Sequence, residues 1–365
     1  MVATDNSTRF ALRATQAARK RLAAWLLVCC SLLVVLIVVG GVTRLTRSGL
    51  SIVEWQPIVG IVPPLDESGW LDLFDKYKQT PEYKLVNRGM SLDAFKEIFW
   101  WEYVHRLLGR LLGLAFLAPM LWFFVRRVID RTLGLKLAGI FFLGALQGAL
   151  GWYMVKSGLV DDPRVSHFRL TAHLGLAFII FAAMFWVALD LIRDRARMSP
   201  TDDLQSTLAR ISSVLVWIVF AMVLTGGLVA GIRAGFAYNT FPLMNGRVVP
   251  SEIFMIEPWY LNFFNNMATV QFDHRLLAGL LVLIVIPLWL ACRKLQPNDV
   301  ARMAANWLLA ALALQIALGI ATLLLRVPVA LAAAHQAGAV TVFAMALWLA
   351  HALRHRVAAT SNLRI

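Results

Sequence analysis

The sequence predicts an all-α polytopic membrane protein whose eight transmembrane helices form two tandem, pseudo-symmetric four-helix bundles. The first observation is composition, because the 365-residue chain is 59% hydrophobic and only 15% charged, too apolar for a soluble domain of this length. The second is that apolar stretches long enough to span a bilayer recur along the chain. The third is a repeat, since motifs of the first half return in the same order in the second.

Apolar stretches of roughly 20 residues are the expected membrane spans. Backbone N–H and C=O groups inside lipid must bond within their own segment, so we expect helices rather than strands. The eight spans are expected at about 22–43, 99–125, 136–156, 169–192, 209–232, 270–291, 303–325 and 331–352.

The distribution of Lys and Arg predicts the orientation. Basic residues concentrate before the first span, after the second, fourth and sixth spans, and in the C-terminal tail. With eight spans these segments fall on one side, which the positive-inside rule makes cytoplasmic. The loop 44–98 carries acidic residues beside its basic ones and is expected to be a small external subdomain. The net charge of +14 therefore reflects topology, and we expect no nucleic-acid partner.

The repeat aligns the two halves of the chain. The matched strings are Val39-Gly40-Gly41 with Thr225-Gly226-Gly227, His105-Arg-Leu-Leu-Gly with His274-Arg-Leu-Leu-Ala, Ala145-Leu-Gln-Gly-Ala-Leu-Gly with Ala313-Leu-Gln-Ile-Ala-Leu-Gly, and Ala172-His173 with Ala334-His335. Each half has an even number of spans, so the halves are expected to face the same way as two parallel bundles. The expected organisation is a cytoplasmic tail at 1–22, an N-terminal bundle at 23–192, a cytoplasmic linker at 193–208, a C-terminal bundle at 209–352 and a cytoplasmic tail at 353–365.

Four histidines occupy matched positions of this repeat. His105 and His274 lie a few residues into the second and sixth spans, and His173 and His335 lie a few residues into the fourth and eighth. All four spans begin on the outer side, so the two histidines of each half should lie at similar depth near the external face. Facing imidazoles can bind an iron porphyrin from both sides. The alternatives are isolated polar residues that bond across helices and a metal cluster without porphyrin, which is disfavoured because no Cys or further carboxylate converges with the histidines.

One carboxylate breaks the repeat. Glu102 lies three residues before His105 and so shares its helix face, whereas the matched residue Gln271 cannot ionise. Arg110 is likewise replaced by Gly279. We interpret this difference as one half holding a reacting molecule and the other a fixed redox group. The alternative is that Glu102 and Arg110 form an internal ion pair or lie at the membrane interface.

Longer strings around these residues carry a resemblance to a known family. The strings run from Gly40 to Ser51, Trp55 to Pro64, Glu102 to Arg110, Ala237 to Met244 and Asn262 to Arg275. They resemble heme A synthases of the proteobacterial and mitochondrial branch, over about residues 25–350. The resemblance implies a membrane oxidoreductase that takes the C8 methyl of heme O through an alcohol to a formyl group, making heme A for cytochrome oxidase.

The resemblance also implies roles for individual residues. The substrate heme O would bind between His105 and His173, with Glu102 as the catalytic residue. The cofactor heme b would be ligated by His274 and His335. The implied partners are the lipid bilayer, heme O synthase and cytochrome oxidase assembly factors, and a homo-oligomer is compatible with the pattern.

Two role assignments stay open. Glu102 could stabilise positive charge that develops at the ring methyl, or accept a proton from attacking water. Arg106 and Arg275, which each follow an expected ligand, could pair with heme propionates or anchor their helices at the interface.

Two rival functions have the same overall pattern. A quinol-linked diheme b-type electron-transfer protein would have similar environments in both halves, which the exchange of Glu102 for Gln271 disfavours. A transporter would more often have broken helices at the membrane midplane. The short N-terminus without a presequence favours the inner (plasma) membrane of a bacterium, with both termini cytoplasmic, over the mitochondrial inner membrane.

Overall fold

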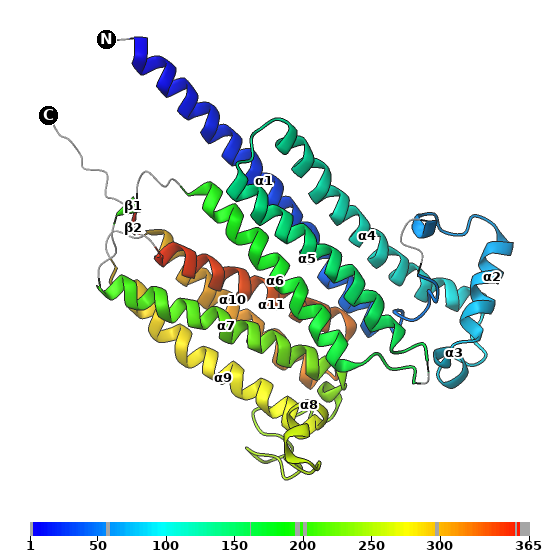
Figure 1. Ribbon diagram of the computed structural model, residues 1–365. Coiled ribbons are helices and arrows are strands. Elements are labelled where there is room, and N and C mark those ends of the chain that lie inside the picture. The colour runs from blue at the N-terminus through cyan, green and yellow to red at the C-terminus, as the bar shows by residue number, and fades with distance from the viewer. Residues whose placement is uncertain are drawn as a thin grey trace.

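Eight long helices dominate the computed structural model of the chain (Figure 1). The structure describes residues 3–55, 59–160, 162–193, 198–199, 203–295, 299–354 and 356–357. The long helices are α1 (Ala3–Leu45), α4 (Leu92–Val125), α5 (Arg131–Lys156), α6 (His167–Ile192), α7 (Asp203–Gly231), α9 (Met267–Cys292), α10 (Asp299–Leu324) and α11 (Val329–Leu353). All eight are long and apolar enough to cross a membrane, which confirms the predicted fold class of an all-helical protein with eight candidate spans.

The start of α4 differs from the prediction by seven residues, because the helix begins at Leu92 rather than near 99. Ser91 caps this end, since its side chain accepts a hydrogen bond from the backbone N–H of Ala94. A helix of 34 residues is about 51 Å long at 1.5 Å per residue, well beyond a hydrocarbon core of about 30 Å. The helix is therefore longer than a membrane span requires, and Phe95 and Phe99 in its first turns are buried against the segment between α1 and α4.

Short elements cover the end of the molecule at which α4 begins (Figure 1). Between α1 and α4 lie the 3-10 turn η1 (Val59–Ile61) and the helices α2 (Glu67–Lys78) and α3 (Pro81–Leu85). Their aromatic residues pack with the first turns of α4 around the fully buried Tyr77, and this burial raises the pKa of the Tyr77 phenol to about 12. In the second half, η3 (Ala234–Phe236), η4 (Trp259–Leu261) and α8 (Asn262–Asn265) connect α7 to α9.

The helices of each half pack in corresponding pairs. In the first half α1 contacts α4 and α6, and α5 contacts α6; in the second half α7 contacts α9 and α11, and α10 contacts α11. The buried apolar residues of both halves nevertheless belong to one continuous cluster, in which the rings of Phe178 and Phe343 lie 5.4 Å apart. Because the halves share this core, the division into two bundles at 193–208 remains a prediction.

Glycines bring the two halves close together where α1 meets α11 and α7 meets α6. A Cβ atom added to Gly41 would collide with the side chain of Gln336, whose amide donates to the backbone oxygen of Ile37 (2.9 Å). A Cβ on Gly227 would lie 3.0 Å from Oγ1 of Thr171. The absence of a side chain at Gly41 and Gly227 thus allows close helix approach.

The opposite end of the molecule is fastened by polar contacts between distant segments. The guanidinium of Arg19 on α1 donates to the backbone oxygens of Asp190 (3.0 Å), Leu191 (3.3 Å) and Arg193 (2.8 Å) at the end of α6. The amide of Gln205 on α7 donates to the backbone oxygen of Leu353 at the end of α11 (3.0 Å). Both halves therefore begin and end at the same side, as an even number of spans in each requires.

Two further features lie at this end. His351 on α11 is buried, and its Nε2 atom lies 3.1 Å from Oδ1 of Asp190. The short strands β1 (Met198–Ser199) and β2 (Arg356–Val357) pair antiparallel, which the sequence does not predict. That this side is cytoplasmic remains a prediction from the distribution of charge.

Candidate functional site

The four repeat-matched histidines come together as two pairs. His105 on α4 lies near enough to His173 on α6 for the two imidazoles to interact electrostatically. His274 on α9 and His335 on α11 are related in the same way. Each pair is thus formed by two helices of one half, as the sequence predicts, and the role of these residues as heme ligands stays a prediction.

Backbone carbonyl groups of neighbouring helices hold the rings of these pairs. The buried imidazoles of His105, His173 and His335 interact with the backbone of Leu36, Gln147 and Gln315, respectively. Such an interaction orients a ring and leaves its other nitrogen for a ligand. One imidazole from each of two helices is a donor set for the iron of a porphyrin, and the residues present fit this group in both halves.

His274 differs from the other three, because its Nδ1 atom lies 2.9 Å from the hydroxyl of Thr225 on α7. A hydrogen bond at Nδ1 fixes the orientation of the ring and selects the nitrogen that remains for a ligand. Thr225 precedes the repeated Gly-Gly string, where the first half has Val39, and its role was not predicted.

A pair of glutamines holds the backbone of two of the histidines. Nε2 of Gln147 on α5 donates to the backbone oxygen of His173 (2.9 Å), and Nε2 of Gln315 on α10 donates to that of His335 (2.9 Å). The sequence repeat contains both glutamines in its Ala-Leu-Gln strings, which was the available signal for this matched role.

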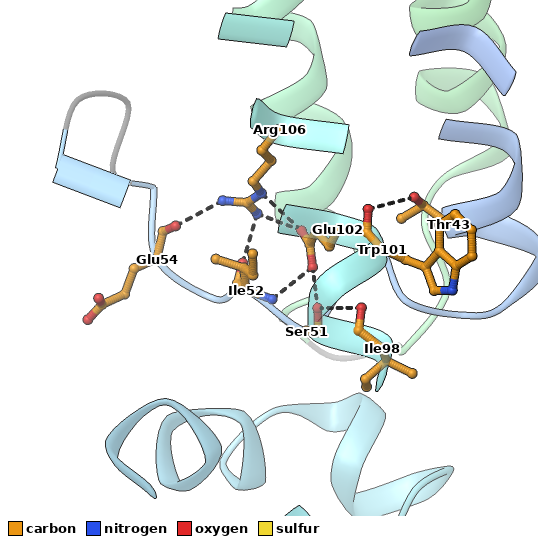
Figure 2. Close-up of polar contacts among 8 residues, drawn as sticks. All are labelled: Thr43, Ser51, Ile52, Glu54, Ile98, Trp101, Glu102 and Arg106. Atoms are coloured by element: carbon orange, nitrogen blue, oxygen red, sulfur yellow. Dashed lines mark hydrogen bonds and ion pairs between the residues drawn. The ribbon is translucent and has the colours of Figure 1, made fainter. Parts of the chain in front are cut away.

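Glu102 is the centre of a buried hydrogen-bond network in the N-terminal part of α4 (Figure 2). One carboxylate oxygen accepts from the hydroxyl of Ser51 and from the backbone N–H of Ile52, each at 2.8 Å. The other oxygen accepts from Nε (3.1 Å) and Nη2 (2.7 Å) of Arg106. The carboxylate is therefore fixed in position by four donors, and it is also near enough to His105 to interact with it electrostatically.

Arg106 extends this network to the external chain. Its guanidinium donates to the backbone oxygens of Ile52 (2.8 Å) and Glu54 (3.1 Å), so it fastens the segment 51–54 to α4 (Figure 2). The internal ion pair that we considered for Glu102 is present, but its partner is Arg106 rather than Arg110. The reason is geometric, because Arg106 lies four residues along the helix from Glu102 and on the same face.

The second half has a neutral version of the same arrangement. Nε2 of Gln271 donates to the backbone oxygen of Ala234 (2.8 Å), and its side-chain oxygen accepts from Arg275 (3.1 Å). Arg275 also donates to the backbone oxygen of Tyr238 (3.0 Å). Each half thus fastens an external segment to the helix of its first histidine, with a charged pair in one half and an amide in the other.

Arg106 and Arg275, which follow His105 and His274, differ in whether a guanidinium N–H donor remains without a partner among the described residues. The guanidinium of Arg106 forms bonds through Nε, Nη1 and Nη2. In Arg275 the Nε atom is buried and has no partner among the described residues, so this donor is available to an acidic group. The predicted pairing of these residues with heme propionates stays a prediction.

A metal cluster without porphyrin finds no support in the arrangement of side chains. Among the residues that the structure describes, no three His, Cys, Asp or Glu side chains converge as they would around a metal ion. The three cysteines, Cys29, Cys30 and Cys292, are buried and free.

Comparison with known proteins shows extended similarity. Residues 23–347 match the COX15-CtaA family, described as cytochrome oxidase assembly protein. The chain is 62% identical over 340 residues to a heme A synthase of Nitrosospira multiformis, which covers 93% of this chain and 95% of the relative. It is 57% identical over 332 residues to a heme A synthase of Nitrosomonas eutropha, with 91% and 93% covered. With a heme A synthase of Parvibaculum lavamentivorans it shares 48% identity over 343 residues, with 94% and 97% covered.

Proposed function

Because this chain belongs to the COX15-CtaA family of heme A synthases, oxidoreductases that convert heme O to heme A, we propose that its two histidine pairs bind two hemes with different roles. His105 and His173 hold the substrate heme O. His274 and His335 hold heme b as a resident cofactor. The matched pairing of buried imidazoles supports this proposal in both halves.

The division of roles depends on one observation, which is that Glu102 is ionisable and its counterpart Gln271 is not. Conversion of the C8 methyl to an alcohol takes up the oxygen of one water molecule and releases two electrons and two protons, and conversion of the alcohol to a formyl group releases two more of each. The electrons pass to a separate oxidant, and positive charge develops at the reacting carbon as they leave. A carboxylate near His105 stabilises this charge. Each oxygen of Glu102 already accepts two hydrogen bonds, so a donor would have to leave one of them before Glu102 could accept a proton, and this favours charge stabilisation over general-base catalysis.

The second half supplies the fixed surroundings of the cofactor. When bound, heme b supplies one-electron transfer, with a potential set by its axial ligands and their hydrogen bonds. Thr225 orients the ring of His274, Gln315 holds the backbone of His335, and Nε of Arg275 can donate to an acidic edge of the cofactor.

The cellular setting follows from the family and the spans. We place the protein in the inner (plasma) membrane of a bacterium, with its heme sites near the external face, since the compared relatives are bacterial and the described residues include eight candidate spans. The family description fits partners among heme O synthase and cytochrome oxidase assembly factors.

The proposal is tested by Glu102→Gln, which keeps the shape of the side chain and removes its charge. We expect heme A formation to fall by about 10²–10³-fold, the effect of losing one preorganised electrostatic group, while heme b remains bound. Glu97→Gln is the matched control, because Glu97 is an exposed glutamate on the same helix. Normal heme A accumulation with Glu102→Gln would show that the catalytic assignment is wrong.

A second experiment separates the synthase from a diheme electron carrier. We expect purified wild-type protein to contain heme b together with heme O or heme A, and His274→Ala to lose heme b. His105→Ala should retain heme b and lose the other heme. Two equivalents of heme b in the wild type, and no heme O or heme A, would instead favour the carrier.

A further inference from the structure

Each of the four histidine rings lies against a glycine of a neighbouring helix. The four contacts, given as the distance from a Cβ atom added to the glycine to Cε1 of the ring, are Gly40 with His105 (2.7 Å), Gly151 with His173 (2.9 Å), Gly226 with His274 (3.3 Å) and Gly319 with His335 (2.8 Å). Real Cβ atoms do not approach other atoms within 3.0 Å, so an alanine at three of these positions would force the ring or the helix to move.

The contacts follow the repeat and are selective. Gly40 and Gly226 lie on α1 and α7 in the repeated Gly-Gly strings, and Gly151 and Gly319 lie on α5 and α10 in the repeated Ala-Leu-Gly strings. Other glycines of the spanning helices behave differently, since a Cβ added at Gly109, Gly113, Gly139, Gly144, Gly148 or Gly279 would have no atom of the described residues within 4 Å. Glycine lowers the stability of a helix relative to alanine. We attribute the presence of glycine at these four positions to the space that an imidazole ring needs there.

On α5 and α10 the glycine acts together with a glutamine. Gln147 lies four residues before Gly151, and Gln315 lies four residues before Gly319, so each pair shares one helix face. The glutamine bonds the backbone oxygen of the histidine, and the glycine faces the edge of its ring. With the backbone held by the glutamine, the space at the glycine decides how the ring can turn.

We propose that Gly40, Gly151, Gly226 and Gly319 are positioning residues that set the orientation of the four heme-binding imidazoles. The proposal rests on the assignment of the histidines as heme ligands. Gly226 and Gly319 act on the ligands of heme b, and Gly40 and Gly151 act on those of heme O. The orientation of a ligating ring is tuned by its surroundings, and changes to such surroundings typically weaken binding by about 10–100-fold.

The first test uses Gly319→Ala in the full-length purified protein, with Gly279→Ala as the matched control in the same half. Heme b is quantified per chain from its reduced-minus-oxidised spectrum, and ring orientation is followed by the EPR g values of the ferric low-spin heme. We expect Gly319→Ala to lower heme b retention by about 10-fold or to shift the g values, and Gly279→Ala to match the wild type. Gly226→Ala should have a smaller effect, because its added methyl lies 3.3 Å from the ring of His274. The same measurements are made on Gly226→Ala if the Gly319→Ala protein does not accumulate.

The second test addresses the substrate half by comparing Gly151→Ala with Gly148→Ala, a control one turn away on the same helix. We expect Gly151→Ala to retain full heme b and lose bound heme O and heme A, whereas Gly148→Ala keeps the wild-type pigment ratio. Gly40→Ala on α1 should resemble Gly151→Ala, since its added methyl lies 2.7 Å from the ring of His105.

The outcomes distinguish this inference from the proposed function. Retention of heme b by both His274→Ala and His335→Ala would overturn the ligand assignment itself. Loss of heme b in those variants, with unchanged heme content and g values in Gly319→Ala and Gly226→Ala, would overturn only the role of the glycines. Equal losses in Gly319→Ala and Gly279→Ala would also overturn it, because the effect would then not depend on contact with the histidine ring.

Discussion

Replacing Arg106 with alanine should release the external segment 51–54, because it leaves the carboxylate of Glu102 buried without its counter-charge. The side chains of Glu102 and Arg106 are only 3% and 17% exposed, so solvent screens their interaction little. Removing one partner of such a pair costs about 3–5 kcal/mol. Two hydrogen bonds from Ser51 and Ile52 remain on the carboxylate, but their partners carry no positive charge.

The double variant Glu102→Ala with Arg106→Ala tests whether the stranded charge is the cause. With both partners gone, the stranded charge is replaced by one new defect, the backbone N–H of Ile52 without its acceptor, at about 1–3 kcal/mol. The backbone oxygens of Ile52 and Glu54 lack the guanidinium in both variants. The second substitution should therefore restore about 2 kcal/mol, which makes the two changes strongly non-additive.

Hydrogen exchange of peptides covering 49–55 measures this local opening directly. A cost of 3–5 kcal/mol predicts exchange at Ile52 that is about 10²–10⁴-fold faster in Arg106→Ala. Arg275→Ala is the matched control, since its partner Gln271 is neutral and no charge is stranded. Equal effects of Arg106→Ala and Arg275→Ala in their own halves, or a double variant less stable than Arg106→Ala alone, would refute the reasoning.

Two further predictions concern other contacts. Thr225→Val removes the hydroxyl that lies 2.9 Å from Nδ1 of His274. We expect this variant to bind heme b fully but to have a midpoint potential that differs by roughly 40 mV, the equivalent of about 1 kcal/mol for one electron. A potentiometric titration with no shift would contradict this prediction. Glu82 on α3 is buried, and this burial raises the pKa of its carboxyl, while Arg47 and Arg233 act in the opposite direction. The pKa of the Glu82 carboxyl in the folded protein therefore lies above its unfolded value of about 4.3. The stability that Glu82 contributes is fully present below the unfolded pKa and is lost as pH rises through the folded pKa. Glu82→Gln should flatten this part of a thermal-denaturation series from acidic to neutral pH, and a curve identical to that of the wild type would count against the assignment.

The membrane spans could be predicted from the sequence because lipid imposes a simple rule on backbone polar groups. The start of α4 could not, since it is set by the Ser91 cap and by aromatic packing on α2, neither of which affects hydropathy. The contacts between the halves were also beyond the sequence. Gly41 and Gly227 face the other half, whereas the adjacent Gly40 and Gly226 face histidines, and nothing in a Gly-Gly string tells these roles apart.

In the candidate site, the repeat predicted which residues matter but not what they contact. His105 and His173 were predicted to form one pair, because the expected topology places both at a similar depth in the membrane. The spacing of Glu102 and His105 suggested a carboxylate directed at the ligand, whereas its hydrogen bonds go to Arg106 and to a segment fifty residues earlier in the chain. Only the folded path of 44–55 brings Ser51 and Ile52 to that position, so helix periodicity could not identify them.

The contacts of α1 also have a consequence for how the protein is made. Arg19 bonds a residue 172 positions later in the chain, and Ile37 accepts a bond from a residue 299 positions later. At about 5–20 residues per second, ribosomes need roughly 10–35 s to supply the first of these partners and roughly 15–60 s to supply the second. During that time the face of α1 around Gly41 meets lipid instead of α11. The span in α1 has the highest mean hydropathy of the eight candidate spans, so α1 is stable in the bilayer before α11 has been synthesised.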